Sequence, residues 1–201
     1  MKTRLILLVL SWAALSVSAQ TKGTTTLGLG VNVFERIYIG GSSENKLRIN
    51  SFNYGIGHFF ADYSRISVDF NSGKETFNRG NRFLVAMTKT IGGQVNYQKY
   101  YHLSKSLHAY AGGSGEYREN NREFDNTTSS TKSYSLGAIG GLTWFIAKRF
   151  AIETKVLSAK AMYAKGTTQQ NDGTERNSAS DFDLQMGGSV TNLNLKIYLL
   201  L

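Results

Sequence analysis

The 201-residue sequence contains no cysteine and no proline, and it has three histidines. Without cysteine the chain has neither a disulfide framework nor a thiol that could carry a lipid anchor. The lack of proline suits long strands, because proline removes a hydrogen-bond donor from a sheet. After the first segment, no apolar run approaches the ~20 residues of a membrane-spanning helix. If the mature chain enters a membrane, it must therefore do so as a closed barrel.

The first segment has the features of a secretory signal peptide. Lys2 and Arg4 precede an apolar run at residues 5–15, and small residues follow it up to Ala19. The run is too short for a membrane anchor, which favours cleavage after Ala19. We therefore expect residues 1–19 to be a signal peptide and residues 20–201 to form one mature domain.

The charge balance is basic. The net charge is +9, and removal of Lys2 and Arg4 lowers it to +7. For an exported chain, this balance indicates lipopolysaccharide or other outer-membrane lipid as the partner. The basic residues are scattered along the sequence and form no arm or helix face, so we expect no nucleic-acid site.

Three stretches share one layout that predicts tight β-hairpins. They begin at Gly55, Val95 and Gly140, and each contains two adjacent aromatic residues and a short polar turn between alternating strands. Longer polar segments separate them and are predicted to be loops, at residues 44–48, 71–82, 119–132 and 165–180. Short and long connections therefore alternate, and eight strands are expected at residues 25–36, 49–61, 65–77, 83–101, 107–118, 133–145, 150–164 and 182–201.

Apolar and polar residues alternate along these strands. Leu27, Leu29 and Val31 share one face of the first strand, and Asn32 lies on the other. A soluble barrel would place the apolar face inside and a membrane barrel would place it outside, and periodicity alone fits both. Aromatic residues near both strand ends match the two girdles of a membrane barrel and favour the second arrangement.

With its signal peptide, eight alternating strands and alternating connection lengths, the sequence resembles the small outer-membrane β-barrel proteins of Gram-negative bacteria. The resemblance is to the outer-membrane protein A and X type and covers the whole mature chain. It implies an all-β fold, an eight-stranded antiparallel up-and-down transmembrane β-barrel in the cell outer membrane. Both ends of the mature chain would then lie in the periplasm.

In that family the last strand carries an alternating apolar signal that the barrel-assembly machinery reads. The residues of this chain that fit it are Leu193, Leu195, Ile197, Leu199 and Leu201, the last of which replaces the usual terminal phenylalanine. Earlier in the same strand, residues 182–186 alternate in the opposite phase. Either a bulge at Gly187 and Gly188 switches the phase or these residues belong to the rim and loop, and we favour the second.

Charged residues are expected inside the barrel. An eight-stranded barrel is just wide enough for side chains to fill, and an unpaired charge there is costly. Counted along the strands from the periplasmic turns, four charged residues lie at similar heights in the barrel. Their positions in the alternation place all four on the inward face. We therefore predict an interior cluster that plugs the lumen, with two polar neighbours helping, at Asp69, Glu153, Lys155, Lys196, Gln98 and Tyr110. In the alternative arrangement, strand tilt staggers these charges so that each meets water.

Candidates for catalysis are few. His102 and Ser104 have the His-x-Ser spacing of the outer-membrane lipid A deacylases, but no carboxylate lies close in sequence to orient the histidine. His58 is expected at the interface and His108 inside the barrel. The calcium-loop motif and the dinucleotide-binding motif GxGxxG are both incomplete, so we expect no metal, cofactor or catalytic residues.

These observations predict a monomeric, non-enzymatic barrel with a structural or adhesive role exercised by four extracellular loops. Within the same fold, the alternatives are a small porin-like channel and an outer-membrane lipid-modifying enzyme. Outside it, the alternative is a secreted, soluble, lipocalin-like ligand-binding barrel.

Overall fold

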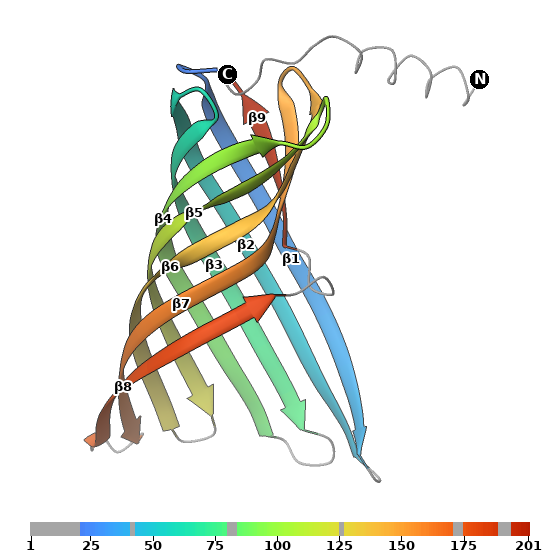
Figure 1. The fold of residues 1–201 in the computed structure, drawn as a ribbon. Coiled ribbons are helices and arrows are strands. Elements are labelled where there is room, and N and C mark those ends of the chain that lie inside the picture. The colour runs from blue at the N-terminus through green and yellow to red at the C-terminus, as the bar shows by residue number, and fades with distance from the viewer. Residues whose placement is uncertain (1–20, 41–42, 80–83, 125–126, 171–174, 189–193) are drawn as a thin grey trace, which may run out of the picture.

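The computed structural model describes residues 21–40, 43–79, 84–124, 127–170, 175–188 and 194–201 (Figure 1). The predicted signal peptide, residues 1–19, and Leu193 lie outside these ranges. Within them no helix is long and apolar enough to cross a bilayer. The strands are β1 (Thr25–Gly40), β2 (Ser43–Ala61), β3 (Ser64–Arg79), β4 (Leu84–His102), β5 (Leu107–Phe124), β6 (Thr127–Ala147), β7 (Phe150–Gln170), β8 (Glu175–Gly188) and β9 (Asn194–Leu200).

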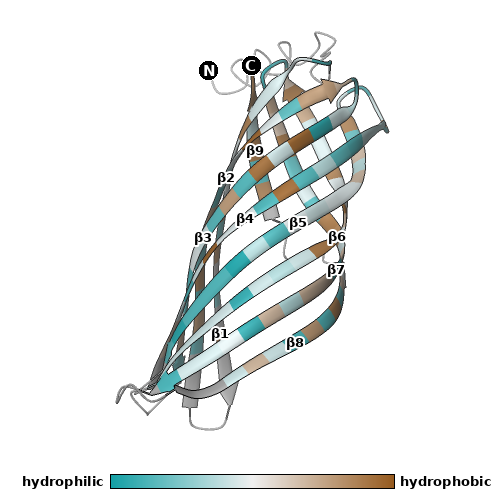
Figure 2. Ribbon diagram, turned by 90° about the vertical axis from the view of Figure 1, so that its left-hand side faces the viewer, coloured by the Kyte–Doolittle hydropathy of each residue, from teal (hydrophilic) through white to brown (hydrophobic). Residues whose placement is uncertain are grey.

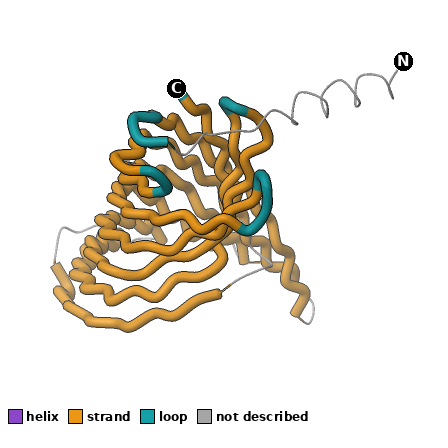
Figure 3. Tube along the Cα trace, turned by 45° about the horizontal axis from the view of Figure 1, so that its top comes forward, coloured by secondary structure: helices purple, strands orange, loops and turns teal. Residues whose placement is uncertain are grey.

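The strands close into a ring. Strands β1 to β7 pair antiparallel in chain order, and β9 pairs with both β7 and β1. Figure 3, in which the top of the barrel comes forward, shows this ring of strands. The predicted all-β, eight-stranded antiparallel up-and-down barrel is thereby confirmed.

The two ends of the barrel differ. At one end, here called the turn end, three very short connections join β2 to β3, β4 to β5 and β6 to β7. The C-terminus lies at this end, at the top of Figure 1. At the opposite end, here called the far end, the strands extend well past the lengths expected from the sequence.

The polar segments predicted as loops are mostly strand, and that prediction was wrong. Strand β3 continues to Arg79, β5 to Phe124 and β7 to Gln170, and β2 already begins at Ser43. Where a hairpin extends beyond the bilayer, both of its faces meet water. These parts of the strands therefore lack the alternation of apolar and polar residues, and their composition resembles that of a loop. Cross-strand polar pairs still support them: the Thr168 hydroxyl donates to the Ser129 hydroxyl at 3.4 Å.

The last strand of the barrel is divided into β8 and β9. Five residues, 189–193, separate Gly188 from Asn194, whereas Val156 alone separates their partners Lys155 and Leu157 on β7. Strand β8 pairs with β7 and, within the described residues, not with β1. In Figure 1, β8 and β1 diverge toward the far end.

Two details of the predicted alternation are corrected here. Residues 182–186 are not rim or loop, because they lie in β8 and pair with β7 from Tyr163 to Ala159. The alternation expected along residues 150–164 does not continue unbroken, because Val156 is the extra residue of a β-bulge. The bulge switches the outward residues of β7 from even to odd numbers, which also explains why β8 and β9 alternate in opposite phases.

The apolar face of the barrel points outward. Large apolar side chains such as Leu29 (58% exposed) and Leu136 (72% exposed) lie on the outer surface. Figure 2 shows hydrophobic residues alternating with more polar ones along the strands. The inward positions hold charged residues such as Arg65, which is 2% exposed. This distribution is typical of a membrane barrel and opposite to that of a soluble one.

Candidate functional site

A buried ion pair crosses the lumen near the turn end. Arg65 on β3 and Glu153 on β7 lie 2.8 Å apart, from Nη2 to Oε2. The Arg65 guanidinium also lies over the ring of Tyr198, 4.3 Å from its centroid. Since both charges are withdrawn from water, each depends on the other for compensation.

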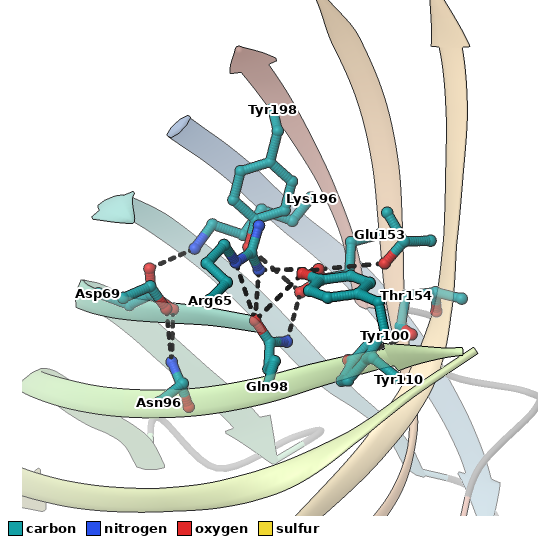
Figure 4. A network of polar contacts seen from close by, with 12 residues as sticks. Arg65, Asp69, Asn96, Gln98, Tyr100, Tyr110, Glu153, Thr154, Lys196 and Tyr198 are labelled. Carbon is teal, nitrogen blue, oxygen red and sulfur yellow. Dashed lines mark hydrogen bonds and ion pairs between the residues drawn. The ribbon is translucent and has the colours of Figure 1, made fainter. Parts of the chain in front are cut away.

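Four neutral side chains complete this group (Figure 4). Glu153 accepts hydrogen bonds on Oε1 from Gln98 Nε2 (3.1 Å) and Tyr198 OH (3.2 Å), and on Oε2 from Tyr100 OH (3.1 Å) and Thr143 Oγ1 (3.2 Å). Gln98 Oε1 in turn accepts from Arg65 Nε at 3.0 Å. Both carboxylate oxygens are therefore satisfied, as a buried charge requires. We call Arg65, Gln98, Tyr100, Thr143, Glu153 and Tyr198 the interior network.

A second ion pair lies beside the interior network. The Lys196 ammonium on β9 contacts Asp69 on β3. The other Asp69 oxygen accepts a hydrogen bond from Asn96 Nδ2 at 2.9 Å. Lys196 also lies 5.0 Å from the centroid of the Tyr198 ring, which connects the two groups.

The lumen is filled on one side of the interior network and hollow on the other. Toward the turn end, Phe59, Phe145 and Leu200 are buried. Toward the far end lie a cavity of about 90 Å³ and a wider one of about 230 Å³. Lys155 lines both cavities. Water can therefore enter from the far end, whereas side chains close the turn end.

The six residues predicted from the sequence all face the lumen, but they form two charge pairs rather than one layer. Glu153 pairs with Arg65, and Lys196 pairs with Asp69. Gln98 joins the interior network, and Tyr110 OH donates to the Thr154 carbonyl oxygen at 3.4 Å. Lys155 has no ion-pair partner among the described residues. That these side chains plug the lumen stays a prediction.

Arg65, the only cation that contacts Glu153 among the described residues, is not among the six predicted residues. Arg65 is the first residue of the strand expected at residues 65–77, next to the short turn, where a charged residue is typical of a strand boundary. Its parity was informative, because Arg65, Ser67 and Asp69 share the inward face of β3. The same signal was available for Tyr100 and Tyr198, which alternate with the outward residues Tyr101 and Ile197 and are buried.

The predicted insertion signal lies on the outward face of β9. Leu195 and Ile197 are exposed, and Ile197 pairs with Leu29 on one side and Ile152 on the other. Leu201 is also exposed and lies just beyond the strand, while Leu193 lies outside the described residues. That the assembly machinery reads these residues stays a prediction.

The histidines show no catalytic arrangement in the described part of the chain. His102 meets His108 edge-on, with ring centroids 5.1 Å apart, and no hydrogen bond joins His102 to Ser104. His108 Nδ1 is buried without a hydrogen-bond partner in the same part of the chain. Nor do the described ranges contain a group of three His, Asp or Glu residues placed to hold a metal ion.

Gly141 makes room for the Tyr110 ring. An added Cβ would lie 2.6 Å from the Tyr110 hydroxyl oxygen and would also meet the Thr154 carbonyl oxygen. We expect Gly141→Val to displace the ring and lower the free energy of unfolding by about 1–3 kcal/mol, measured by urea titration in detergent micelles. At the control position, Gly113, the nearest atom would lie 3.7 Å from the added Cβ. Gly113→Val should therefore cost less, and equal losses would contradict the steric explanation.

Comparison with solved structures finds other barrels of similar shape, including the following two. The structure matches the translocator domain of the autotransporter NalP from Neisseria meningitidis with 14% identity and a TM-score of 0.50. The match covers 91% of this chain and 66% of that domain. It also matches the outer membrane protein OprG from Pseudomonas aeruginosa with 11% identity and a TM-score of 0.54, over 92% of this chain and 96% of OprG.

Comparison of the amino-acid sequence with known families and proteins finds no match. No protein-family model matches the chain, and no curated protein sequence matches it. At the low identities of the structural matches, the similarity concerns the fold. The chain has the fold of the small outer-membrane β-barrel proteins.

Proposed function

We propose that the protein is a monomeric, non-enzymatic integral protein of the outer membrane with a structural or surface-interaction role. The observation that carries this proposal is an apolar outer surface around a closed ring of strands. Such a surface is stable in lipid, and toward the turn end, where β9 pairs with both β7 and β1, the ring leaves no strand edge unpaired. The interior network supports a lumen closed to solutes, because an eight-stranded barrel is filled by its own side chains.

The orientation follows from the two different ends. Export through the signal peptide at residues 1–19 would deliver the chain to the periplasm, and the assembly machinery would insert it with β9 as the closing strand. The turn end then faces the periplasm and the far end faces the outside. The far end presents four polar hairpins, β1–β2, β3–β4, β5–β6 and β7–β8. These hairpins, rather than long loops, would meet surface partners.

A small channel is the second candidate, and the two cavities favour it. Together the two cavities extend from the far end to the interior network. A solute could therefore cross the barrel only if the side chains of this network moved aside. Planar-bilayer recording separates the two functions. The structural role predicts no steady conductance, and stable unitary currents would support the channel.

The test of the proposed location uses the full chain expressed in a Gram-negative host. We expect the protein in the outer-membrane fraction, with faster migration on gels before boiling than after it, because a closed barrel resists detergent at room temperature. An outer-membrane barrel and a cytoplasmic enzyme serve as fractionation controls. Recovery as a soluble periplasmic protein without detergent would overturn the proposal.

A further inference from the structure

Two lysines lie directly opposite each other on the outer surface near the far end. Lys132 on β6 and Lys165 on β7 are register partners, and both are exposed. Within the described residues, neither ammonium has an ion-pair or hydrogen-bond partner. Like charges directly opposite on neighbouring strands destabilise a sheet, so this pair has a cost that an anion between the lysines would remove.

Neighbouring side chains leave the lysine pair positive. Glu119 on β5 is the register partner of Lys132, but its carboxylate accepts hydrogen bonds from Tyr117 OH (3.2 Å) and Asn121 Nδ2 (3.4 Å) instead. One step further toward the far end, Ser130 and Thr167 form the next outward register pair. Their hydroxyl groups can donate hydrogen bonds to the same anion.

A row of aromatic residues lies next to the lysine pair on the side of the turn end. Register pairs join Tyr117 to Tyr134, Tyr134 to Tyr163 and Tyr163 to Phe182. All four are exposed on the outer surface, and the rings of Tyr117 and Tyr134 lie 5.2 Å apart. Such a row marks the level of the lipid head groups in a membrane barrel.

On the turn-end side of the aromatic row, small residues leave a groove in the apolar outer surface. The groove has a volume of about 560 Å³ and runs across β4 to β8, and its lining includes Gly93, Gly115, Leu136 and Ala161 beside the four aromatic residues. The basic pair, the aromatic row and the groove thus follow one another along the same two strands, β6 and β7.

We propose that this face binds a phosphorylated, acylated glycolipid of the outer leaflet. Its phosphate lies between Lys132 and Lys165, and one acyl chain lies in the groove. A phosphate fits the site because it supplies negative charge and several acceptor oxygens at head-group height. This inference rests on the proposed membrane location.

The experiment uses the full mature chain, folded in detergent micelles and checked by heat-modifiable migration. Lipid A is titrated and bound copies are counted by native mass spectrometry. We expect Lys132→Gln with Lys165→Gln to weaken binding by about tenfold or more, from the loss of two head-group lysines. Ala161→Phe, which fills the groove, should also weaken it.

The matched control is Arg48→Gln with Lys74→Gln. It removes the same charge from two exposed positions of β2 and β3, away from the groove, and should leave the affinity within about twofold. Dephosphorylated lipid A should bind wild type no better than lipid A binds the lysine variant. Equal loss in both charge variants, equal binding of phosphatidylglycerol, or full affinity in Ala161→Phe would overturn the proposal. Absence of binding by a folded barrel would overturn this inference alone, whereas a failed membrane fractionation would overturn the proposed location.

Discussion

Replacing Arg65 with methionine is expected to lower the free energy of unfolding by about 3–5 kcal/mol. The change leaves Glu153 buried without its cation, and Glu153 is 7% exposed. Methionine keeps much of the side-chain volume, so the loss reports the charge rather than an empty space. Urea titration of the barrel in detergent micelles measures it.

A double-mutant cycle isolates the pair. Glu153→Gln alone should also be destabilising, and the double variant should lose clearly less than the sum of the two single losses. The control cycle is Lys46→Met with Glu35→Gln, an ion pair of 2.7 Å whose side chains are both 43% exposed. Each of those changes should cost less than about 1 kcal/mol. Additive losses in the Arg65 cycle would show that the interior ion pair contributes no coupling.

Deletion of residues 199–201 is expected to abolish insertion. Leu201 exchanges two backbone hydrogen bonds with Thr25, at 2.9 and 3.1 Å, and Leu200 N donates to the Arg149 carbonyl oxygen at 2.9 Å. Without these contacts the ring cannot close at the turn end, and lipid cannot satisfy the edges of β1 and β7 that become unpaired. We expect a periplasmic, protease-sensitive chain without heat-modifiable migration.

The control for the deletion is Leu201→Phe. It keeps the backbone pairing and supplies the terminal aromatic residue of the family that the sequence resembles, so insertion should be at least as efficient as in wild type. Refolding the truncated chain in micelles, without assembly machinery, separates closure from recognition. A truncated chain that refolds in micelles but fails in cells would assign the last three residues to recognition. Normal insertion in cells would contradict both roles.

The sequence predicts strands well where one face meets lipid. Leu27, Leu29 and Val31 alternate with polar or small residues, and this period reflects two different environments on the two faces of β1. At the far end both faces of the hairpins meet water, so residues 127–131 carry no such pattern although they belong to β6. Composition alone could not distinguish these hairpins from loops.

The interior contacts are harder to predict because they depend on tilt and register. Parity correctly suggests that Asp69 and Lys196 face the lumen, but partners across a barrel are set by strand tilt and shear. Arg65, four positions before Asp69 on β3, reaches Glu153 on β7. The bulge at Val156 follows from the register between β6 and β7, which a single strand does not encode.

The junction between β1 and β9 bears on the order of folding. Five register pairs close the ring there, from Thr26–Leu200 to Gly30–Lys196. These pairs join the positions most distant in sequence, so the loop-closure entropy is largest for them and the number of contacts that repay it is small. The hairpins that meet at the short turns bring together neighbouring segments and can form earlier. We therefore expect the ring to close last at the β1–β9 junction, after the hairpins have formed.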